Sequence, residues 1–246
     1  MKYVMSDIHG DYEKYRAMLD LINFNEEDDL YILGDVVDRG EHGMKVLQHM
    51  MEHSNIIPIL GNHELMAYQN LKWLAKEITE ESLAELGEDR MQHLLEWLGN
   101  GGGTTMREFR ALSPEERQEI LEYFREFWGF VEVEAGGWQY LLVHAGFETF
   151  EPEKPLEAYG LEELVWARMD VEKTYYKDKV IVFGHTPTRH FYAQKQGKLL
   201  SQLSKEEVCD EVYESEDGML LGIDCACGFG GRLGCVCLDT RERFYV

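Results

Sequence analysis

Three short segments decide the architecture of this chain: Asp7-Ile8-His9-Gly10, Gly34-Asp35-Val36-Val37-Asp38-Arg39-Gly40 and Gly61-Asn62-His63-Glu64. Each segment follows a short apolar run, and apolar residues with helical spacing lie between the runs. This alternation predicts parallel strands joined by helices, and therefore an α/β fold. Because ligands bind beyond the carboxyl ends of such strands, the polar side chains of all three segments are candidates for a functional site.

The rest of the chain continues this pattern with one interruption. Residues 65–128 are rich in Leu, Glu, Met and Trp, which predicts a helical insertion. Within it, Ser113-Pro114-Glu115-Glu116 is typical of a capped helix start. Residues 130–143 predict a hairpin around two glycines, and residues 179–183 a further strand. We expect short strands and turns over residues 190–246.

Five motifs follow one another in order: D-x-H-G at residues 7–10, G-D-x-x-D-R-G at 34–40, G-N-H-E at 61–64, H-A-G at 144–146 and G-H-T at 184–186. The set resembles the phosphoprotein phosphatase family of the calcineurin-like metallophosphoesterases, and its bacterial-type serine/threonine phosphatases in particular. The resemblance implies a two-sheet β-sandwich flanked by helices, which carries the helical insertion. It also implies a single domain over residues 1–246.

A pair of divalent metal ions is part of the same resemblance. The residues that match the family's metal ligands are Asp7, His9 and Asp35 for one ion, and Asp35, Asn62, His144 and His185 for the other. An extended backbone would point Asp7 and His9 the same way, and Asp35 has two oxygens with which to bridge the ions. The mixture of carboxylate, amide and imidazole suits manganese, our first choice, or iron or zinc better than calcium.

The resemblance assigns the attack on phosphorus to a water that bridges the two ions. His63 is the candidate general acid for the leaving group, and Asp38 would orient its imidazole. Arg39 is the candidate clamp for the phosphate, because its planar fork suits bidentate contact. Arg168 lies in a segment similar to the one that carries a second arginine in the family, so it is a second candidate clamp. A charge that merely ends a helix is the alternative for Arg168.

Two further features have alternative interpretations. The glycine-rich residues 100–105 either bring backbone N–H groups to an anion or simply connect two helices. The cysteine pairs at residues 225–227 and 235–237 either pack as small apolar residues on two strands, which we favour, or bind zinc. The single residue between the members of each pair is unusual for a zinc site.

Composition restricts the partners of the chain. A formal net charge of −23 over 246 residues argues against sequence-independent binding to nucleic acid, which depends on Lys and Arg. An anionic substrate remains compatible, because bound cations would dominate the local field. The sequence contains no apolar run of membrane-spanning length and no signal-peptide pattern. We therefore expect a cytoplasmic protein without membrane association and without a disulfide framework.

The predicted function is metal-dependent hydrolysis of phosphomonoesters, with phosphoserine or phosphothreonine in proteins as the favoured substrate. A hydrolase of symmetrical dinucleoside polyphosphates is the alternative, because it shares this machinery. Glu64 favours the phosphatases, since the hydrolases more often carry Asp there, and Ala145 favours a bacterial-type member. A binding protein that retains the fold without turnover is a further alternative. Neither the native metal nor the oligomeric state follows from the sequence.

Overall fold

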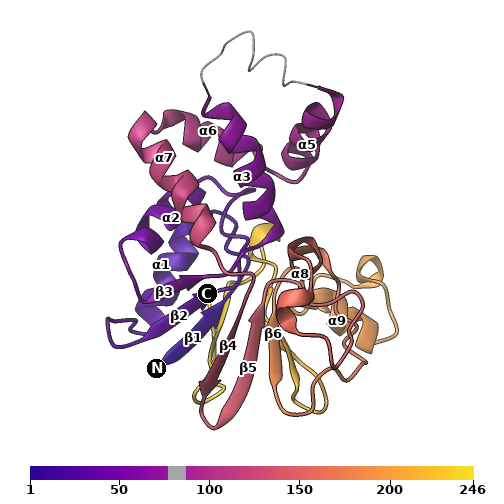
Figure 1. The fold of residues 1–246 in the computed structure, drawn as a ribbon. Helices are drawn as coiled ribbons and strands as arrows, with labels where there is room; N and C mark the ends of the chain where they lie inside the picture. Colours follow the sequence, from indigo (N-terminus) through magenta and orange to yellow (C-terminus); the bar gives the residue numbers. More distant parts are fainter. Residues whose placement is uncertain (77–86) are drawn as a thin grey trace.

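Two β-sheets form the centre of the protein in the computed structural model, which describes residues 1–76 and 87–246 (Figure 1). The first sheet contains β1 (Lys2–Met5), β2 (Asp29–Ile32), β3 (Ile56–Pro58), β9 (Gly234–Cys237) and β10 (Arg243–Tyr245). The second contains β4 (Phe130–Ala135), β5 (Trp138–Val143), β6 (Val180–Phe183), β7 (Tyr213–Glu214) and β8 (Leu220–Gly222). The strand orders are β10-β9-β1-β2-β3 and β4-β5-β6-β8-β7. Strands β1, β2 and β3 run parallel, as do β5, β6 and β8.

Alternating side chains of the central strands bury opposite faces of each sheet. Val4 of β1 and Leu142 of β5 belong to one apolar cluster that lies between the sheets. Their chain neighbours point outward, where Met5 packs with the N-terminal helices and Leu141 packs with the helices beside the second sheet. Both sheets are therefore buried on both faces, which is the predicted two-sheet sandwich flanked by helices.

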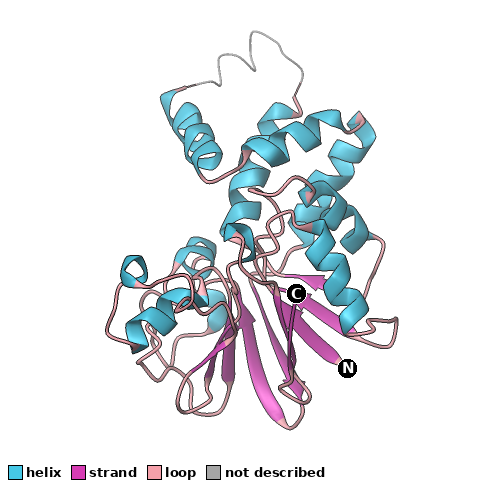
Figure 2. Ribbon diagram, turned by 180° about the vertical axis from the view of Figure 1, so that it is seen from behind, coloured by secondary structure: helices cyan, strands magenta, loops and turns pink. Residues whose placement is uncertain are grey.

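Helices cover the outer faces of this sandwich (Figures 1 and 2). The helices of the described residues are α1 (Tyr12–Leu21), α2 (Gly43–Met51), α3 (Asn62–Leu74), α5 (Glu88–Gly99), α6 (Gly103–Ala111), α7 (Pro114–Tyr123), α8 (Leu161–Trp166) and α9 (Thr188–Lys195). Short 3-10 turns occupy Phe124–Glu126, Leu156–Ala158, Leu200–Gln202 and Cys227–Phe229. Figure 1 shows α3, α5, α6 and α7 grouped beyond one end of the sheets, in agreement with the predicted helical insertion. Residues 77–86 of that insertion lie outside the described residues.

The starts of two helices in the insertion coincide with motifs identified in the sequence. Helix α3 begins at Asn62, inside the third motif, so the insertion starts from the functional segment itself. At the start of α7, the hydroxyl of Ser113 accepts from the amide of Glu116 at 3.2 Å, and the Glu116 carboxylate accepts from the amide of Ser113 at 2.7 Å. This reciprocal pair is the predicted capping box.

The C-terminal region differs from the prediction in two places. The expected strands and turns over residues 190–246 were wrong at the start, where α9 continues to Lys195 because Phe191 and Ala193 pack inward. The expected strand at Cys225–Cys227 was also wrong, because Ala226 is left-handed (φ 62°) and a 3-10 turn begins at Cys227.

The four paired cysteines are buried, as the favoured interpretation expects. Cys225 lies in the cluster between the sheets, whereas Cys227 lies in the cluster under the N-terminal helices. Cys235 and Cys237 share one face of β9, because strand residues two apart point the same way. Among the described residues, neither group of side chains arranged to hold a metal ion contains a cysteine. The zinc interpretation therefore has no support from the geometry.

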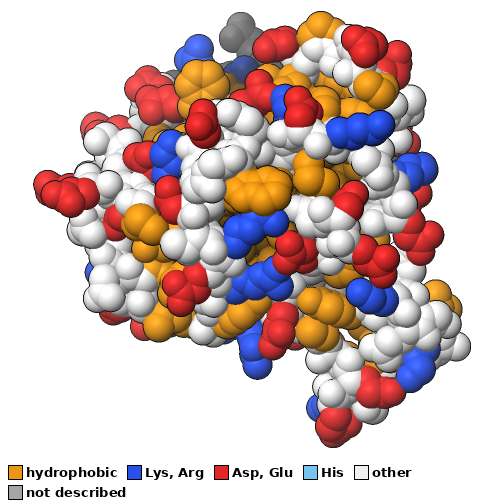
Figure 3. Space-filling view, turned by 90° about the horizontal axis from the view of Figure 1, so that it is seen from below, with side chains coloured by type: hydrophobic (Ala, Val, Ile, Leu, Met, Phe, Trp, Pro, Cys, Tyr) orange, Lys and Arg blue, Asp and Glu red, His pale blue; other side chains and the backbone are white. Residues whose placement is uncertain are grey.

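Many of the acidic side chains lie on the surface of the protein. Figure 3 shows acidic side chains spread over the face that it draws, with lysines and arginines between them, so the net charge of −23 is not gathered in one tract of that face. Among the described residues, no helix is both long enough and apolar enough to cross a membrane.

Gly34 allows the second and third motifs to approach each other. Its φ is +79°, and an added Cβ would lie 2.4 Å from the backbone nitrogen of Gly61. We expect Gly34→Ala to lower the free energy of unfolding by about 2–5 kcal/mol, since it combines left-handed strain with overpacking. Gly137 is a matched control, because its φ is +80° but nothing lies within 4 Å of an added Cβ. Urea denaturation should show a loss of only about 1–2 kcal/mol for Gly137→Ala, and equal losses would contradict the role of crowding.

Candidate metal centre

Most of the predicted site residues lie on sharply turned backbone just after the strands. Of the nine non-glycine residues with positive φ among those described, six are predicted site residues: Asp7, His9, Asp35, Asp38, Arg39 and His185. Such conformations cost on the order of 1–3 kcal/mol each and cluster at functional sites, where the surrounding structure enforces them.

The prediction that an extended backbone aligns Asp7 with His9 was wrong. Strand β1 ends at Met5, and both residues are left-handed, with φ of 55° and 49°. Hydrogen bonds to the next motif hold them instead. The amide of Asp7 donates to the carbonyl of Gly34 at 3.1 Å, and the amide of His9 donates to that of Asp35 at 2.8 Å. The two strand-end loops therefore position each other.

Asp35 stands between two groups of potential metal ligands. His9 and His63 form one group with it, and His144 and His185 form the other. Its Oδ2 lies 3.6 Å from Nε2 of His9, whereas its Oδ1 lies 3.4 Å from Nε2 of His144. The two oxygens of one carboxylate thus face different groups, as a ligand shared by two ions requires.

Asn62 and Asp7 complete this region. Oδ1 of Asn62 lies 3.0 Å from Nε2 of His144 and 2.9 Å from Nδ1 of His185. The carboxylate of Asp7 accepts from the amide of His185 at 3.1 Å and from the hydroxyl of Ser6. The structure therefore brings all six predicted ligands into one largely buried region.

Backbone carbonyls fix the orientation of two imidazoles. Nδ1 of His9 donates to the carbonyl of Val37 at 3.0 Å, and Nδ1 of His144 donates to that of Leu33 at 2.5 Å. Each bond leaves Nε2 directed at Asp35, which is how proteins orient histidines that bind metals. In His185, Nε2 is buried and has no hydrogen-bond partner.

Buried carboxylates give this region an excess of negative charge. Burial, together with the charges of Asp224 and Asp35, raises the pKa of Asp7 well above its usual value. Burial and the charge of Asp35 likewise raise the pKa of Asp224 to about 7. For Asp35 itself, burial would raise the pKa, but the surrounding imidazoles, led by His144, hold the pKa below its usual range. Crowded carboxylates together with the imidazoles of His144 and His185 fit divalent cations, which would compensate this charge.

Asp224 was missed by the sequence reasoning, although the signal was present. It lies two residues beyond the end of β8, the same position that Asp7 has after β1. No motif drew attention to it, because it is surrounded by cysteines and glycines rather than by other ligand types. Its carboxylate accepts from the amide of Ala226 at 2.9 Å, so it also shapes the loop that follows.

His63 and Asp38 form a buried pair beside the first group. Nδ1 of His63 donates to Oδ2 of Asp38 at 2.7 Å. Burial acts to lower the pKa of His63, but the carboxylates of Asp35 and Asp38 outweigh it, and the pKa is raised. Nη2 of Arg39 lies 3.2 Å from Nε2 of His63, and Nη1 lies 2.8 Å from Nε2 of His9. The three predicted catalytic groups of this side therefore meet in the structure.

The helical insertion supports this pair through Trp97, which the sequence reasoning missed, and through Thr105, which belongs to the glycine-rich segment that the sequence reasoning singled out. Nε1 of Trp97 in α5 donates to Oδ2 of Asp38 at 2.9 Å. The hydroxyl of Thr105 in α6 donates to Oδ1 of Asp38 at 2.6 Å and accepts from its amide at 2.9 Å. Gly101 accepts from the amide of Arg39 at 3.1 Å. Residues 100–105 therefore hold Asp38 and Arg39 in place, rather than acting as a loose connector.

We expect Thr105→Val to lower the free energy of unfolding by about 2 kcal/mol, because it leaves buried groups of Asp38 without partners. Thr105 and Asp38 are both completely buried, so water cannot replace the lost hydroxyl. Thr105→Ser is the matched control, since it keeps the hydroxyl and should lose less. Chemical denaturation of the two variants measures the difference. Equal stability would show that the two hydrogen bonds contribute nothing.

Glu64 is the fourth residue of the third motif and acts on the backbone. Its Oε2 accepts from the amides of Asp35 (2.7 Å) and Gly61 (3.1 Å). Its Oε1 accepts from those of Val36 (2.8 Å) and Val37 (3.2 Å). Burial and the nearby charge of Asp35 raise the pKa of Glu64 to about 7, although the amides oppose this. One side chain thus fixes the loop that carries Asp35.

Arg168 lies at the other edge of the site. It is exposed, and its Nη1 donates to the hydroxyl of Thr186 at 3.0 Å, next to His185. Helix α8 ends at Trp166, so Arg168 lies beyond the helix. Burial, His144 and Arg168 are among the causes that lower the pKa of His185 to about 3. The position suits a second phosphate clamp and does not by itself assign that role.

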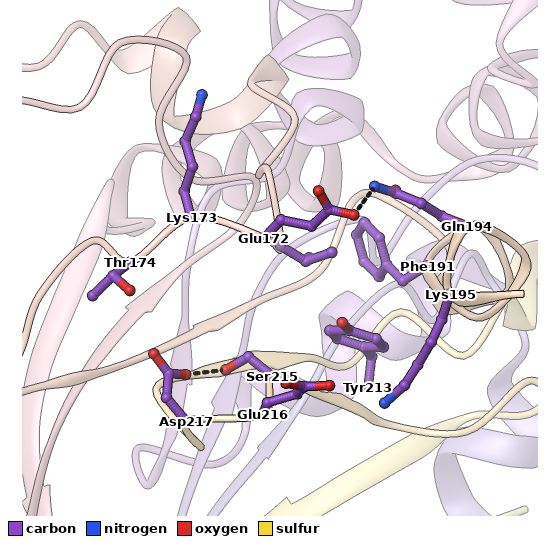
Figure 4. Close-up of a pocket in the computed structure, with 11 residues that line it drawn as sticks. Glu172, Lys173, Thr174, Phe191, Gln194, Lys195, Tyr213, Ser215, Glu216 and Asp217 are labelled. Atoms are coloured by element: carbon purple, nitrogen blue, oxygen red, sulfur yellow. Dashed lines mark hydrogen bonds between the residues drawn. The ribbon is translucent and has the colours of Figure 1, made fainter. Parts of the chain in front are cut away.

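The cavity in Figure 4 is a different part of the molecule. It lies between the segment around Glu172, helix α9 and the turn after β7, and it contains none of the predicted site residues. Two pairs of its polar side chains are bonded to each other, Gln194 with Glu172 at 3.2 Å and Ser215 with Asp217 at 2.6 Å. We therefore assign the chemistry to the strand ends and not to this cavity.

Comparison with known proteins identifies the family. The model of the calcineurin-like phosphoesterase family matches residues 3–214. The chain therefore belongs to this family, and the resemblance seen in the sequence is confirmed. The fold is similar to the crystal structure of a metallophosphoesterase from Sphaerobacter thermophilus, with a TM-score of 0.53 and 15% identity over 99% of this chain and 86% of that one.

Two curated relatives bear on the branch of the family. The symmetrical bis(5'-nucleosyl)-tetraphosphatase of Wigglesworthia glossinidia brevipalpis is 39% identical over 102 residues, which cover 39% of this chain and 36% of the relative. This match thus spans little more than a third of the relative's length. Serine/threonine-protein phosphatase 2 of Salmonella typhimurium is 26% identical over 68% of this chain and 67% of its own length. The second relative supports membership of the phosphoprotein phosphatase branch.

Proposed function

We propose that this protein hydrolyses phosphoric esters or anhydrides with the help of two divalent metal ions, manganese first among the candidates. The observation that carries the proposal is the position of Asp35, whose two oxygens face two different groups of buried ligands. In this proposal the ligands of one ion are Asp7, His9 and Asp35, and those of the other are Asp35, Asn62, His144 and His185.

In the proposed reaction the ions and the side chains of the protein have different roles. When bound, the ions would polarise the phosphoryl oxygens and lower the pKa of a water molecule. Arg39 and Arg168 would hold the phosphoryl group from the two edges of the site. His63, oriented by Asp38, would pass a proton from Nε2 to the leaving oxygen. Because Nε2 contacts Arg39 at 3.2 Å, a substrate phosphate that draws Arg39 away would free His63 for this role.

The first candidate substrate is a dinucleoside polyphosphate. The symmetrical tetraphosphatase from Wigglesworthia glossinidia brevipalpis supports it, because its identity to this chain is higher than that of the protein phosphatase. The matched region is short, so the experiment below decides between the two. The second candidate is a phosphoserine or phosphothreonine protein, which the longer match to the Salmonella typhimurium relative supports.

The test compares two substrates on the manganese-loaded protein. We expect kcat/KM for diadenosine tetraphosphate, followed by chromatography of the nucleotide products, to exceed that for a phosphoserine peptide by at least about tenfold, or ~1.4 kcal/mol. Removal of metal by a chelator should abolish both activities, and manganese should restore them. A higher value for the peptide would favour the second candidate. A metal-loaded protein that cleaves neither substrate would contradict the proposal.

A further inference from the structure

Two exposed aromatic side chains stand at opposite ends of the site. Phe229 has 57% of its surface exposed, and Cζ of Arg39 lies 4.3 Å from the centre of its ring. Trp166 has 43% of its surface exposed, and its ring lies 5.9 Å from that of His185. Single exposed apolar side chains are common on protein surfaces, so it is the position of these two rings beside the residues of the metal centre, and not their exposure alone, that points to a ligand.

A chain of contacts joins the two aromatic rings through the metal centre. From Phe229 it passes to Arg39, whose guanidinium contacts His9 and His63. Asp35 connects those imidazoles to His144, and Asn62 connects His144 to His185. Trp166 then packs against His185 at the far end. The order along the site is therefore aromatic ring, cation, metal ligands and aromatic ring.

The loop that carries Phe229 is built to lie close to the centre. An added Cβ at Gly228 would lie 2.3 Å from the ring of His9 and 2.9 Å from the guanidinium of Arg39. Only glycine allows this approach, which sets Phe229 over Arg39. A cleft of about 400 Å³ begins here, and His9, Arg39, Lys14 and Gly228 contribute to its lining. Gly230 also contributes to the lining, so the residues on both sides of Phe229 border this cleft.

We propose that Phe229 and Trp166 are stacking platforms for the two bases of a dinucleoside polyphosphate. This inference rests on the proposed function and names the residues that would select its substrate. Such a molecule has a flat base at each end of an anionic chain, which matches an aromatic ring at each end of a centre that would hold two cations beside Arg39. Aromatic side chains stack on any base, and arginine beside the ring adds cation–π attraction. A phosphoserine peptide offers no such pair of flat ends.

The test uses Phe229→Leu and Trp166→Leu, which remove the rings but keep apolar side chains. Each variant should lower the ratio of kcat/KM for diadenosine tetraphosphate to kcat/KM for a phosphoserine peptide by about tenfold, through a higher KM for the dinucleotide. Phe229→Trp and Trp166→Phe should restore most of the ratio. Trp138→Leu is the matched control, because Trp138 is another exposed aromatic residue that packs on an arginine, with its ring 4.2 Å from Cζ of Arg241.

The possible outcomes distinguish a failure of this inference from a failure of the proposed function on which it rests. If the unmodified protein cleaves the dinucleotide and both leucine variants keep its KM, the inference is overturned and the proposed function stands. If both variants lose activity equally on the dinucleotide and on the peptide, the rings support the site as a whole and the inference is again overturned. If the unmodified protein cleaves only the peptide, the proposed substrate and the inference both fail. A change of KM in Trp138→Leu would show an effect that is not specific to the site.

Discussion

Asp35→Asn is expected to remove both metal ions from the protein and to abolish hydrolysis. The carboxylate oxygens lie 3.6 Å from His9 and 3.4 Å from His144, on the two sides of the centre. An amide has one oxygen and one N–H₂ group, so it can serve one ion at most and presents a donor to the other. Loss of a residue that merely supports a ligand costs about 10- to 100-fold in metal affinity, and loss of a shared ligand should cost more.

The measurement is elemental analysis of metal-loaded, desalted protein, together with turnover of the preferred substrate. Near-ultraviolet circular dichroism shows whether the variant has folded. Asp217→Asn is the matched control, because Asp217 lies on an exposed turn and accepts from Ser215 and the amide of Met219. That variant should keep two ions and full activity. Retention of two ions by Asp35→Asn would refute a shared ligand, whereas retention of one would show that the remaining amide oxygen still serves that ion.

The position of the candidate ligands at strand ends was predictable because it follows from local pattern. Short apolar runs predict the strands, and the polar residues after them must lie at one edge of a parallel sheet. The predicted reason why Asp7 and His9 point to the same place was nevertheless wrong, since their backbone is left-handed and not extended. Spacing indicated that the two residues belong together, whereas the bonds to Gly34 and Asp35 that hold them were visible only in three dimensions.

Contacts between distant segments were the part that the sequence could not supply. Trp97 lies 59 positions from Asp38, and nothing in its surroundings shows that its indole would reach a carboxylate at the metal centre. Leu, Glu and Trp in the insertion predict helices but not which face meets the strand ends. Similarly, the paired cysteines suggested two strands, because alternation alone cannot reveal the left-handed turn at Ala226. The spacing of apolar residues predicts helices and strands, whereas tertiary packing determines which of them contact one another.

His63→Asn is expected to lower kcat by about 100- to 10,000-fold, the usual contribution of a positioned general acid, while both metal ions remain bound. The geometry makes this a sharp test, because His63 also lies among residues that could hold an ion with His9 and Asp35. The bond from its Nδ1 to Asp38 at 2.7 Å is compatible with both roles, and its Nε2 lies 3.8 Å from the carboxylate of Asp35, so metal content has to be measured together with turnover.

Metal content and turnover together assign the role of His63. The matched control is His93→Asn, since His93 is exposed on α5 and should change neither quantity. Two ions with low turnover would assign proton transfer to His63. Loss of one ion would make His63 a ligand, and normal turnover would remove it from the reaction. The imidazole is held on one side by Asp38, which Trp97 and Thr105 fix in turn, so the helical insertion is the part of the chain that would keep this acid aimed at the substrate.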